Sequence, residues 1–204
     1  PDGGWLSPYC FCHNLSDSLK KKFNFEIFQG SKVTAISKTG STNGSGKVDN
    51  NNWQLTLESN EHSETSQHFD AVVICAGHLS NKISNLSSPI PLQSVRGQVS
   101  RLNNTNPMNQ LSTVLCHKGY ATPSQGEYQS FGATFDKDND NEAVNELDTV
   151  KNIKQIQNIY SESKWAKQIR HEHIIGNKAA IRATSPDHMP LAGELFSNNW
   201  LKNF

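Results

Sequence analysis

The order of apolar and polar positions predicts one helix and three strands in the N-terminal part of the chain. Ser7 and Pro8 begin the helix, because a hydroxyl caps the first turn and proline fits its first position. The helix is expected to end near Lys22. Its apolar face carries Phe11, Cys12, Leu15 and Leu19. Strands are predicted at residues 23–28, 31–37 and 53–58.

A strand is predicted at residues 69–76, where an unbroken apolar run at residues 71–76 ends at Gly77. Such a run is typical of a strand buried on both faces of a parallel sheet. The carboxyl end of such a strand often borders a ligand crevice. We therefore expect a binding site at this strand end, followed by a short helix at residues 79–83.

The composition changes after Pro89, where short alternating segments between polar turns predict an antiparallel sheet. The predicted strands are residues 95–102, 113–117, 120–122 and 128–134. An acidic loop at residues 136–145 precedes two segments of helical periodicity, residues 147–160 and 165–169. The last predicted strand carries Arg182.

Arg182 is the main candidate for chemistry. Apolar and β-branched residues of the last predicted strand precede this arginine, and a turn rich in proline and glycine follows at residues 186–193. A guanidinium suits a carboxylate, because its planar fork donates two parallel hydrogen bonds and keeps its charge. The alternative is a solvated strand arginine. Tyr120, before the turn at Pro123, is a second candidate, although such a tyrosine more often fills a core or an interface.

The charges balance, with 19 Lys and Arg against 19 Asp and Glu, so no overall field attracts nucleic acid or a membrane. One local patch remains. Lys164, Lys167 and Arg170 fall three apart, a spacing that can follow phosphates but that also suits a solvated helix face.

The chain carries neither a secreted disulfide framework, nor an apolar run long enough to cross a bilayer, nor a signal sequence. We therefore expect a cytoplasmic protein without membrane contact. The sequence has no initiator methionine and no closing element, so we expect a piece of a longer protein.

No metal site is expected. Cys10 and Cys12 lack a second ligand pair and are expected to be packing residues. His171 and His173 have no identifiable third ligand. Residues 136–142 resemble the start of a calcium loop, but the glycine and the bidentate glutamate that the loop requires are missing. A non-catalytic module that binds calcium there remains one alternative function.

Four segments, in order, resemble the D-amino-acid-oxidase superfamily of FAD-dependent amine oxidases, which includes glycine and sarcosine oxidases. They are residues 3–8, residues 70–78 (Asp-Ala-Val-Val-Ile-Cys-Ala-Gly-His), residues 96–100 (Arg-Gly-Gln-Val-Ser) and residues 182–193. Residues 114–123, 165–167 and 182–190 are similar to superfamily members that act on the wobble uridine of tRNA. The resemblance covers almost the whole chain.

The resemblance implies an α/β fold with an α+β substrate domain. Residues 1–87 would form part of a Rossmann-like FAD-binding domain that lacks the N-terminal dinucleotide fingerprint. Residues 88–182 would form an antiparallel-sheet substrate domain, and residues 183–204 a truncated return segment to the FAD domain.

The resemblance also implies a reaction. The oxidoreductase would remove the carboxymethyl group from 5-carboxymethylaminomethyl-(2-thio)uridine at the tRNA wobble position, giving 5-aminomethyl-(2-thio)uridine. FAD would be the cofactor of the complete protein. S-adenosylmethionine would be a second cofactor only if a methyltransferase domain precedes. An oxidase of free glycine or sarcosine, with the same fold and carboxylate anchor, is the alternative enzyme.

The implied site residues fall into three groups. Arg182 would hold the substrate carboxylate, and Tyr120 would cover the same carboxylate or the amine. The positions that match cofactor contacts are Val33, Ala76, Gly77 and His78. The candidate tRNA contacts are Lys164, Lys167 and Arg170, which a free amino acid would not require. Because several flavin-binding segments of the family are missing, we expect the chain alone to bind FAD weakly or not at all and to be inactive.

Overall fold

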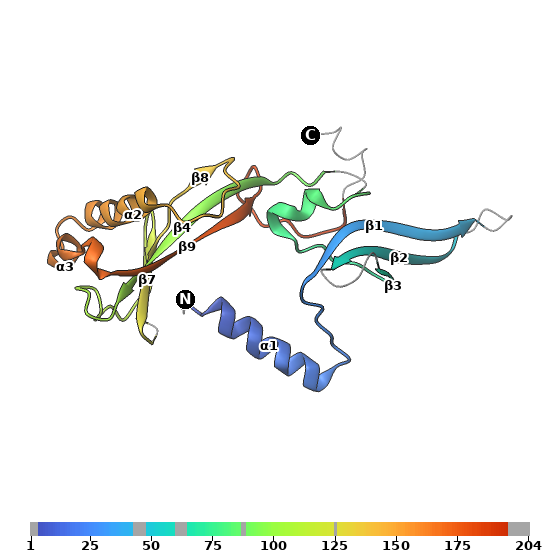
Figure 1. The fold of residues 1–204 in the computed structure, drawn as a ribbon, viewed down its shortest axis with the longest axis horizontal. Helices are drawn as coiled ribbons and strands as arrows, with labels where there is room; N and C mark the ends of the chain where they lie inside the picture. Colours follow the sequence, from blue (N-terminus) through green and yellow to red (C-terminus); the bar gives the residue numbers. More distant parts are fainter. Residues whose placement is uncertain (1–3, 43–47, 60–64, 87–88, 125, 196–204) are drawn as a thin grey trace. The chain divides into compact units, whose positions relative to one another are not determined.

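The computed structural model describes residues 4–42, 48–59, 65–86, 89–124 and 126–195. The chain divides into two compact units (Figure 1). Unit 1 consists of Pro1–Phe23 and Ser94–Arg182, and unit 2 of Asn24–Gln93 and Ala183–Phe204. Each unit contains its own antiparallel sheet.

Helix α1 (Pro8–Lys22) has the bounds that the sequence predicts. The Ser7 side chain accepts a hydrogen bond from the backbone N–H of Cys10, at 3.4 Å, which satisfies one of the free donors of the first turn. None of the residues of α1 is buried. Cys10 and Cys12 are exposed free thiols, so the expectation that they pack in a core is wrong.

The sheet of unit 2 has the order β1-β2-β3, formed by β1 (Ser31–Thr42), β2 (Val48–Ser59) and β3 (Thr65–Phe69). Ile36 and Leu57 are its buried apolar residues among those described. The strand predicted at residues 23–28 is not formed, because no neighbouring strand in the described part of the chain pairs with it. Phe23 and Phe28 are therefore exposed.

The strand predicted for the apolar run at residues 71–76 is also wrong. The run forms no strand, and Val73 is 85% exposed. A doubly buried strand requires parallel neighbours on both sides, and the described residues provide none. The run leads into the 3₁₀ helix η1 (Gly77–Lys82). Ser84 then joins β1 through a parallel bridge to Ala35.

The sheet of unit 1 confirms the antiparallel block predicted after Pro89. Its order is β5-β6-β7-β4-β8, and β9 also pairs with β4. The strands are β4 (Gln93–Asn103), β5 (Leu115–Cys116), β6 (Tyr120–Ala121), β7 (Tyr128–Gly132), β8 (Asp136–Lys137) and β9 (Ile174–Thr184). The helices are α2 (Glu146–Ile159), α3 (Lys164–Gln168) and the 3₁₀ helix η2 (His171–His173).

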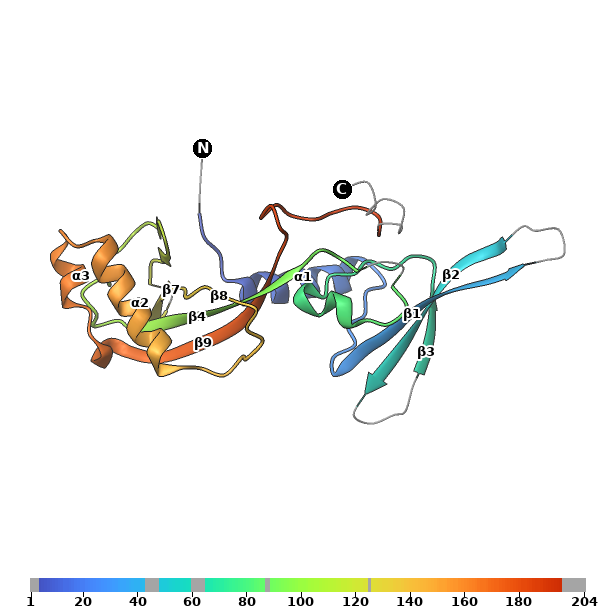
Figure 2. The same cartoon turned by 90° about the horizontal axis from the view of Figure 1, so that it is seen from above.

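Helices α2 and α3 lie beside β4, β7 and β9 within unit 1 (Figures 1 and 2). A core of buried side chains joins the helices to the sheet. It contains Leu102, Met108, Ala121, Phe131, Ile156 and Ile169. Burial of the large members of this core, each worth about 1.5–3 kcal/mol when fully buried, fixes α2 against β7 and β4.

Strand β4 turns its polar face toward α2. Three of its buried side chains are polar and find partners on that helix. Arg96 Nη1 donates to Asp148 Oδ2 at 2.5 Å, Gln98 Nε2 donates to Thr149 Oγ1 at 3.2 Å, and Asn152 Nδ2 donates to Ser100 Oγ at 3.2 Å. Burying polar groups is tolerated because they are hydrogen-bonded. The opposite face of β4 therefore carries Val95, Gly97 and Val99.

No helix in the described ranges is both long enough and apolar enough to pass through a lipid bilayer.

Candidate carboxylate-binding site

Arg182 lies on the face of the unit 1 sheet that points away from α2. The Ser100 hydroxyl, which α2 contacts, donates to Asn177 Oδ1 at 2.7 Å, so Asn177 points toward the helix. Side chains alternate along a strand. Lys178, Ala180 and Arg182 therefore point to the other side, which we call the Arg182 face.

The Arg182 guanidinium passes over Gly97 of β4. A Cβ at position 97 would collide with Nη2 of Arg182, so this close approach requires a glycine. Nη2 donates to the backbone carbonyl of Thr134 at 3.0 Å. The guanidinium carbon lies 5.7 Å from the ring centroid of Phe135. These contacts hold the charged group in place while Arg182 remains exposed to a ligand.

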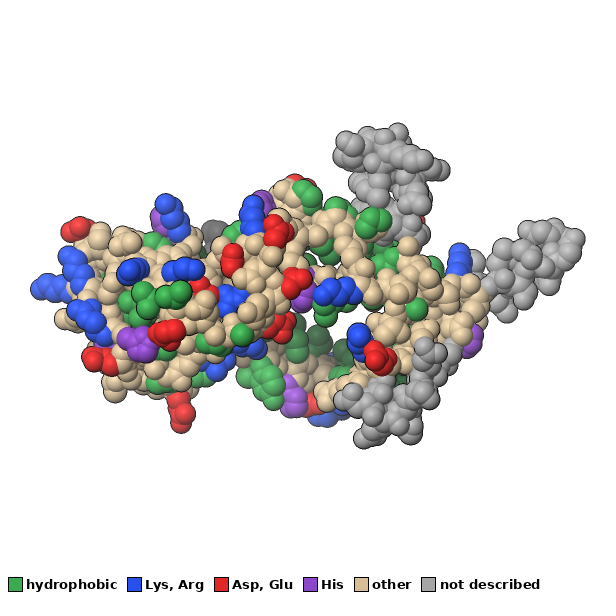
Figure 3. Space-filling view, turned by 45° about the horizontal axis from the view of Figure 1, so that its top comes forward, with side chains coloured by type: hydrophobic (Ala, Val, Ile, Leu, Met, Phe, Trp, Pro, Cys, Tyr) green, Lys and Arg blue, Asp and Glu red, His purple; other side chains and the backbone are tan. Residues whose placement is uncertain are grey.

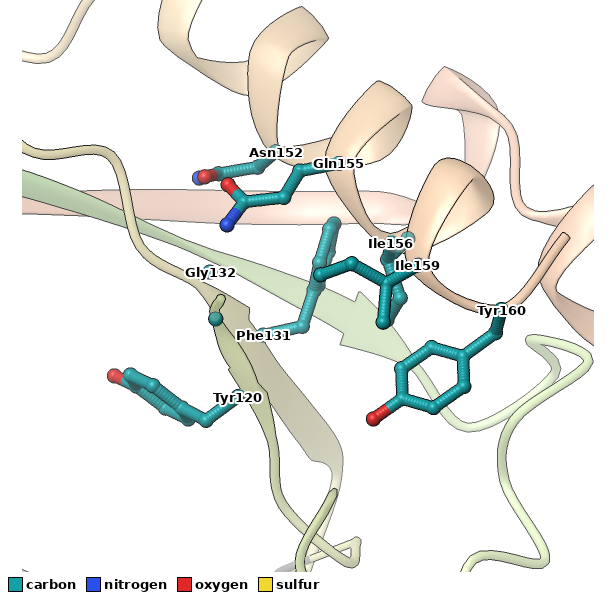
Figure 4. A pocket seen from close by; sticks show the side chains of 9 residues that line it. Tyr120, Phe131, Gly132, Asn152, Gln155, Ile156, Ile159 and Tyr160 are labelled. Carbon is teal, nitrogen blue, oxygen red and sulfur yellow. The ribbon is translucent and has the colours of Figure 1, made fainter. Parts of the chain in front are cut away.

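Tyr120 lies close enough to Arg182 for the two to interact electrostatically. It pairs with Gly132 of β7, and its ring lies on the side of the strands away from α2 (Figure 4). Burial raises the pKa of the Tyr120 phenol, while the positive charge of Arg182 acts in the opposite direction. The phenol therefore keeps its proton at neutral pH and can donate a hydrogen bond.

Two glycines allow the strand that carries Tyr120 to pack tightly. A Cβ on Gly119 would lie 2.7 Å from the carbonyl oxygen of Gly132. Gly132 itself has a φ of 143°, a region that favours glycine. Gln155 of α2 donates to the carbonyl of Lys118 at 2.5 Å. The helix thus supports the backbone on which Tyr120 is mounted.

The cavity in Figure 4 lies between α2 and the strands and belongs to the core. It holds ≈ 10 Å³, about the space of one water molecule. Asn152 Oδ1, buried and without a hydrogen-bond partner in the described structure, lines it. A water that donates to this oxygen would satisfy it, but no substrate fits.

Sequence reasoning identified Arg182 and Tyr120 but not the groups around them. Thr134 contributes only a backbone carbonyl, so its side chain gives no signal. Phe135 follows β7 and is 54% exposed, which no periodicity predicts. Gly97, a glycine inside a strand, was the available signal of a close approach.

The basic stripe lies over a different part of unit 1. Lys167 and Arg170 line an open groove of ≈ 480 Å³ between α2 and α3, together with Lys154 and His171, whereas Lys164 does not. Lys and Arg side chains gather over this end of unit 1 (Figure 3). Arg170 donates to the carbonyls of Lys167 and Ile169, and His171 Nε2 lies 2.6 Å from Glu146 Oε1. Arg170 therefore already uses some of its donors within the chain.

The four predicted cofactor residues belong to unit 2. Val33 lies on β1, and Ala76 immediately precedes η1, which begins with Gly77 and His78. The bridge between Ala35 and Ser84 brings the chain after η1 beside β1.

Gly77 tests whether these residues fit FAD. It has a φ of 55° and no other atom within 4 Å of a Cβ built on it, so its exposed backbone leaves room for a close ligand. The backbone of this segment is accessible to a ligand. The phosphate-binding βαβ turn of dinucleotide sites does not occur in the described residues.

The acidic loop after β8 is held by an arginine. Arg96 Nε donates to the Asn141 carbonyl and Arg96 Nη2 to the Ala143 carbonyl, both at 2.6 Å. A cation already occupies these two carbonyls. Within the described ranges, no group of three or more His, Cys, Asp or Glu side chains could hold a metal ion.

Comparison with solved structures shows the fold. Glycine oxidase from Geobacillus kaustophilus superposes with a TM-score of 0.63 at 16% identity, covering 83% of this chain and 40% of that one. Glycine oxidase from Bacillus cereus gives a TM-score of 0.56 at 17% identity, covering 83% and 42%.

Sequence comparison gives curated relatives. Two are named tRNA 5-methylaminomethyl-2-thiouridine biosynthesis bifunctional protein MnmC. The protein from Idiomarina loihiensis is 31% identical over 97% of this chain, and that from Pseudoalteromonas translucida is 33% identical over 94%. The chain spans only 29% and 26% of their lengths.

The model of the DAO family, described as FAD dependent oxidoreductase, matches residues 1–203. This match extends over both units and includes Arg182, Tyr120 and the segment around Gly77. The chain therefore belongs to the DAO family of FAD-dependent oxidoreductases.

Proposed function

We propose that this chain carries the carboxylate-binding part of an oxidoreductase that acts on wobble uridine in tRNA. The substrate would be 5-carboxymethylaminomethyl-(2-thio)uridine, whose side chain is an N-substituted glycine. The observation that carries the proposal is the exposed Arg182 guanidinium, held over Gly97 beside a protonated Tyr120. The curated relatives named for tRNA 2-thiouridine biosynthesis support this substrate class.

Arg182 would bind the glycine-like carboxylate through two parallel hydrogen bonds. The Nη2 bond to Thr134 fixes the orientation of the guanidinium, and Tyr120 would donate its phenolic proton to the carboxylate. These contacts would orient the methylene group for reaction. FAD, the cofactor of the family, supplies the acceptor for the hydride that leaves this carbon. Loss of the hydride and the amine proton gives an imine, and water converts it to the aminomethyl product and glyoxylate.

We further propose that Lys164, Lys167 and Arg170 contact phosphates of the tRNA. Lys167 and Arg170 line an open groove, and all three side chains are exposed, which suits a polyanion. Val33, Ala76, Gly77 and His78 would contribute one edge of the FAD site.

Oxidation of free glycine or sarcosine is the second candidate. The similarity to glycine oxidases in fold favours it. It would use Arg182 in the same way, because both substrates present a carboxylate next to the reacting carbon.

The experiment compares the two substrates in the complete gene product. Nucleoside mass spectrometry of tRNA digests should show conversion of the carboxymethylaminomethyl nucleoside, together with release of glyoxylate. Replacing Arg182 with Met should abolish this conversion. Oxidation of free glycine without conversion of tRNA would establish the second candidate, and an unchanged rate in Arg182→Met would refute the role of Arg182.

A further inference from the structure

Five strands of the unit 1 sheet carry cations but no carboxylates. β4, β5, β6, β7 and β9 contain no Asp or Glu. Their cations are Arg96, Arg101, Lys178 and Arg182. Arg96 is neutralised by Asp148 under α2. Three positive charges on these strands therefore remain without an acidic partner in the described structure.

All three lie on the Arg182 face. Along β4, Arg96, Gln98 and Ser100 point toward α2, so Arg101 points away from it. Along β9, Lys178 and Arg182 are four residues apart and share a face. The strand rise places their Cα atoms about 13 Å from each other.

Arg101 is held ready for a ligand. Its guanidinium stacks on the ring of Tyr128, 4.7 Å from the centroid. The stack orients the planar group, yet its N–H groups make no hydrogen bond to any described residue. Lys178 is exposed and likewise has no hydrogen-bond or ion-pair partner in the described ranges. Both side chains have free donors for an oxyanion.

A free amino acid offers a single carboxylate, for which Arg182 suffices. A nucleotide within an RNA strand adds a phosphodiester on each side of the reacting base, and phosphates attract Arg and Lys. Arg101, Lys178 and Arg182 match this set of charges.

We propose that Arg101 and Lys178 bind the phosphates next to the nucleotide whose carboxylate Arg182 holds. This inference rests on the proposed tRNA function and assigns the RNA backbone to the same sheet face as the reacting group. The stripe at Lys164, Lys167 and Arg170 would then contact the RNA elsewhere.

The test measures how tightly the 204-residue chain binds a synthetic anticodon stem-loop RNA. Fluorescence anisotropy gives the affinity over a range of salt concentrations. Each phosphate contact on a single strand contributes ~0.7 to the magnitude of the slope of log K against log salt concentration. Loss of two contacts should therefore lower this magnitude by about 1.4. The double variant Arg101→Gln/Lys178→Gln should show this drop. Arg101→Lys, which keeps the charge but loses the fork and the stack, should weaken binding and retain most of the slope.

The control is Lys32→Gln, which removes one positive charge from unit 2, where Lys32 pairs with Glu58. It should leave affinity and slope unchanged, and circular dichroism should show that every variant is folded. Unchanged affinity and slope in the double variant would refute the inference, as would failure of the wild-type chain to bind the RNA. Failure of the proposed function is a separate result, seen when the complete gene product oxidises glycine but leaves tRNA unchanged.

Discussion

The guanidinium of Arg182 lies across the backbone of Gly97, where no Cβ could be accommodated without displacing it. The two residues lie on the paired strands β9 and β4. One strand supplies the charge and the other supplies the space for it. The carboxylate-binding function that we propose for Arg182 therefore depends on a residue that need not contact the ligand.

Gly97→Ala should lower kcat/KM of the complete gene product on tRNA by about 100-fold, as expected when a binding group shifts by roughly 1 Å. The methyl group would push the guanidinium away from the Thr134 carbonyl. Steady-state kinetics on modified tRNA measures the effect.

Gly176→Ala is the matched control, because it adds the same methyl group to β9 at a position with no atom within 4 Å. It should keep wild-type kinetics. Equal kcat/KM for Gly97→Ala and wild type would mean that Arg182 reaches its ligand in another conformation.

Tyr120→Phe should raise KM for the carboxylate substrate about 10–100-fold, since a hydrogen bond to a charged group is worth about 1.5–3 kcal/mol. Comparison of this variant with the wild type also gives the pKa of the Tyr120 phenol. Because burial raises the pKa of Tyr120 above its ordinary value of 10.0, the phenolate signal lost in the variant should appear above pH 10. Ultraviolet difference titration measures it, and a signal at lower pH would contradict the protonated state.

Asp148→Ala should reduce the free energy of unfolding by about 3–5 kcal/mol, because it leaves the buried Arg96 without its partner. Chemical denaturation measures the loss. Lys151→Ala is the control, since Lys151 contacts the same carboxylate from an exposed position and should cost less than about 1 kcal/mol.

The ion pair between Asp148 and Arg96 also predicts how the free energy of unfolding depends on pH. Desolvation would raise the pKa of Asp148, but hydrogen bonds from Lys151 and Arg96 outweigh it and hold the pKa below its ordinary value of 3.8. Between the lowered pKa in the folded chain and the ordinary value of 3.8, the unfolded chain binds the proton and the folded chain does not. Stability therefore rises with pH in this range. The contribution of Asp148 should be complete above pH 3.8 and decline as the pH falls below it. Asp148→Asn should flatten this part of the stability curve.

The chain by itself should bind FAD weakly or not at all, because its described residues contain no βαβ phosphate site. Flavin fluorescence titration and the absorption spectrum of the purified chain measure this. A stoichiometric flavin spectrum would show that the site is more complete than the described residues indicate.

Local signals in the sequence were sufficient for several elements. Ser7 and Pro8 determine the start of α1, and the turn residues separate the antiparallel strands of unit 1. These features depend on neighbours along the chain. The apolar run at residues 71–76 failed as a strand prediction because a strand is defined by hydrogen bonds to other segments.

The sequence by itself determined that β4 alternates between Val95, Gly97 and Val99 on one side and polar residues on the other. Only the tertiary structure decided which side faces α2. Helix α2 presents Asp148, Thr149 and Asn152 to the polar side, and the hydrogen bonds they form offset the cost of removing those groups from water. The glycine side was thereby left for Arg182, whose position depends on a partner strand that is distant in sequence.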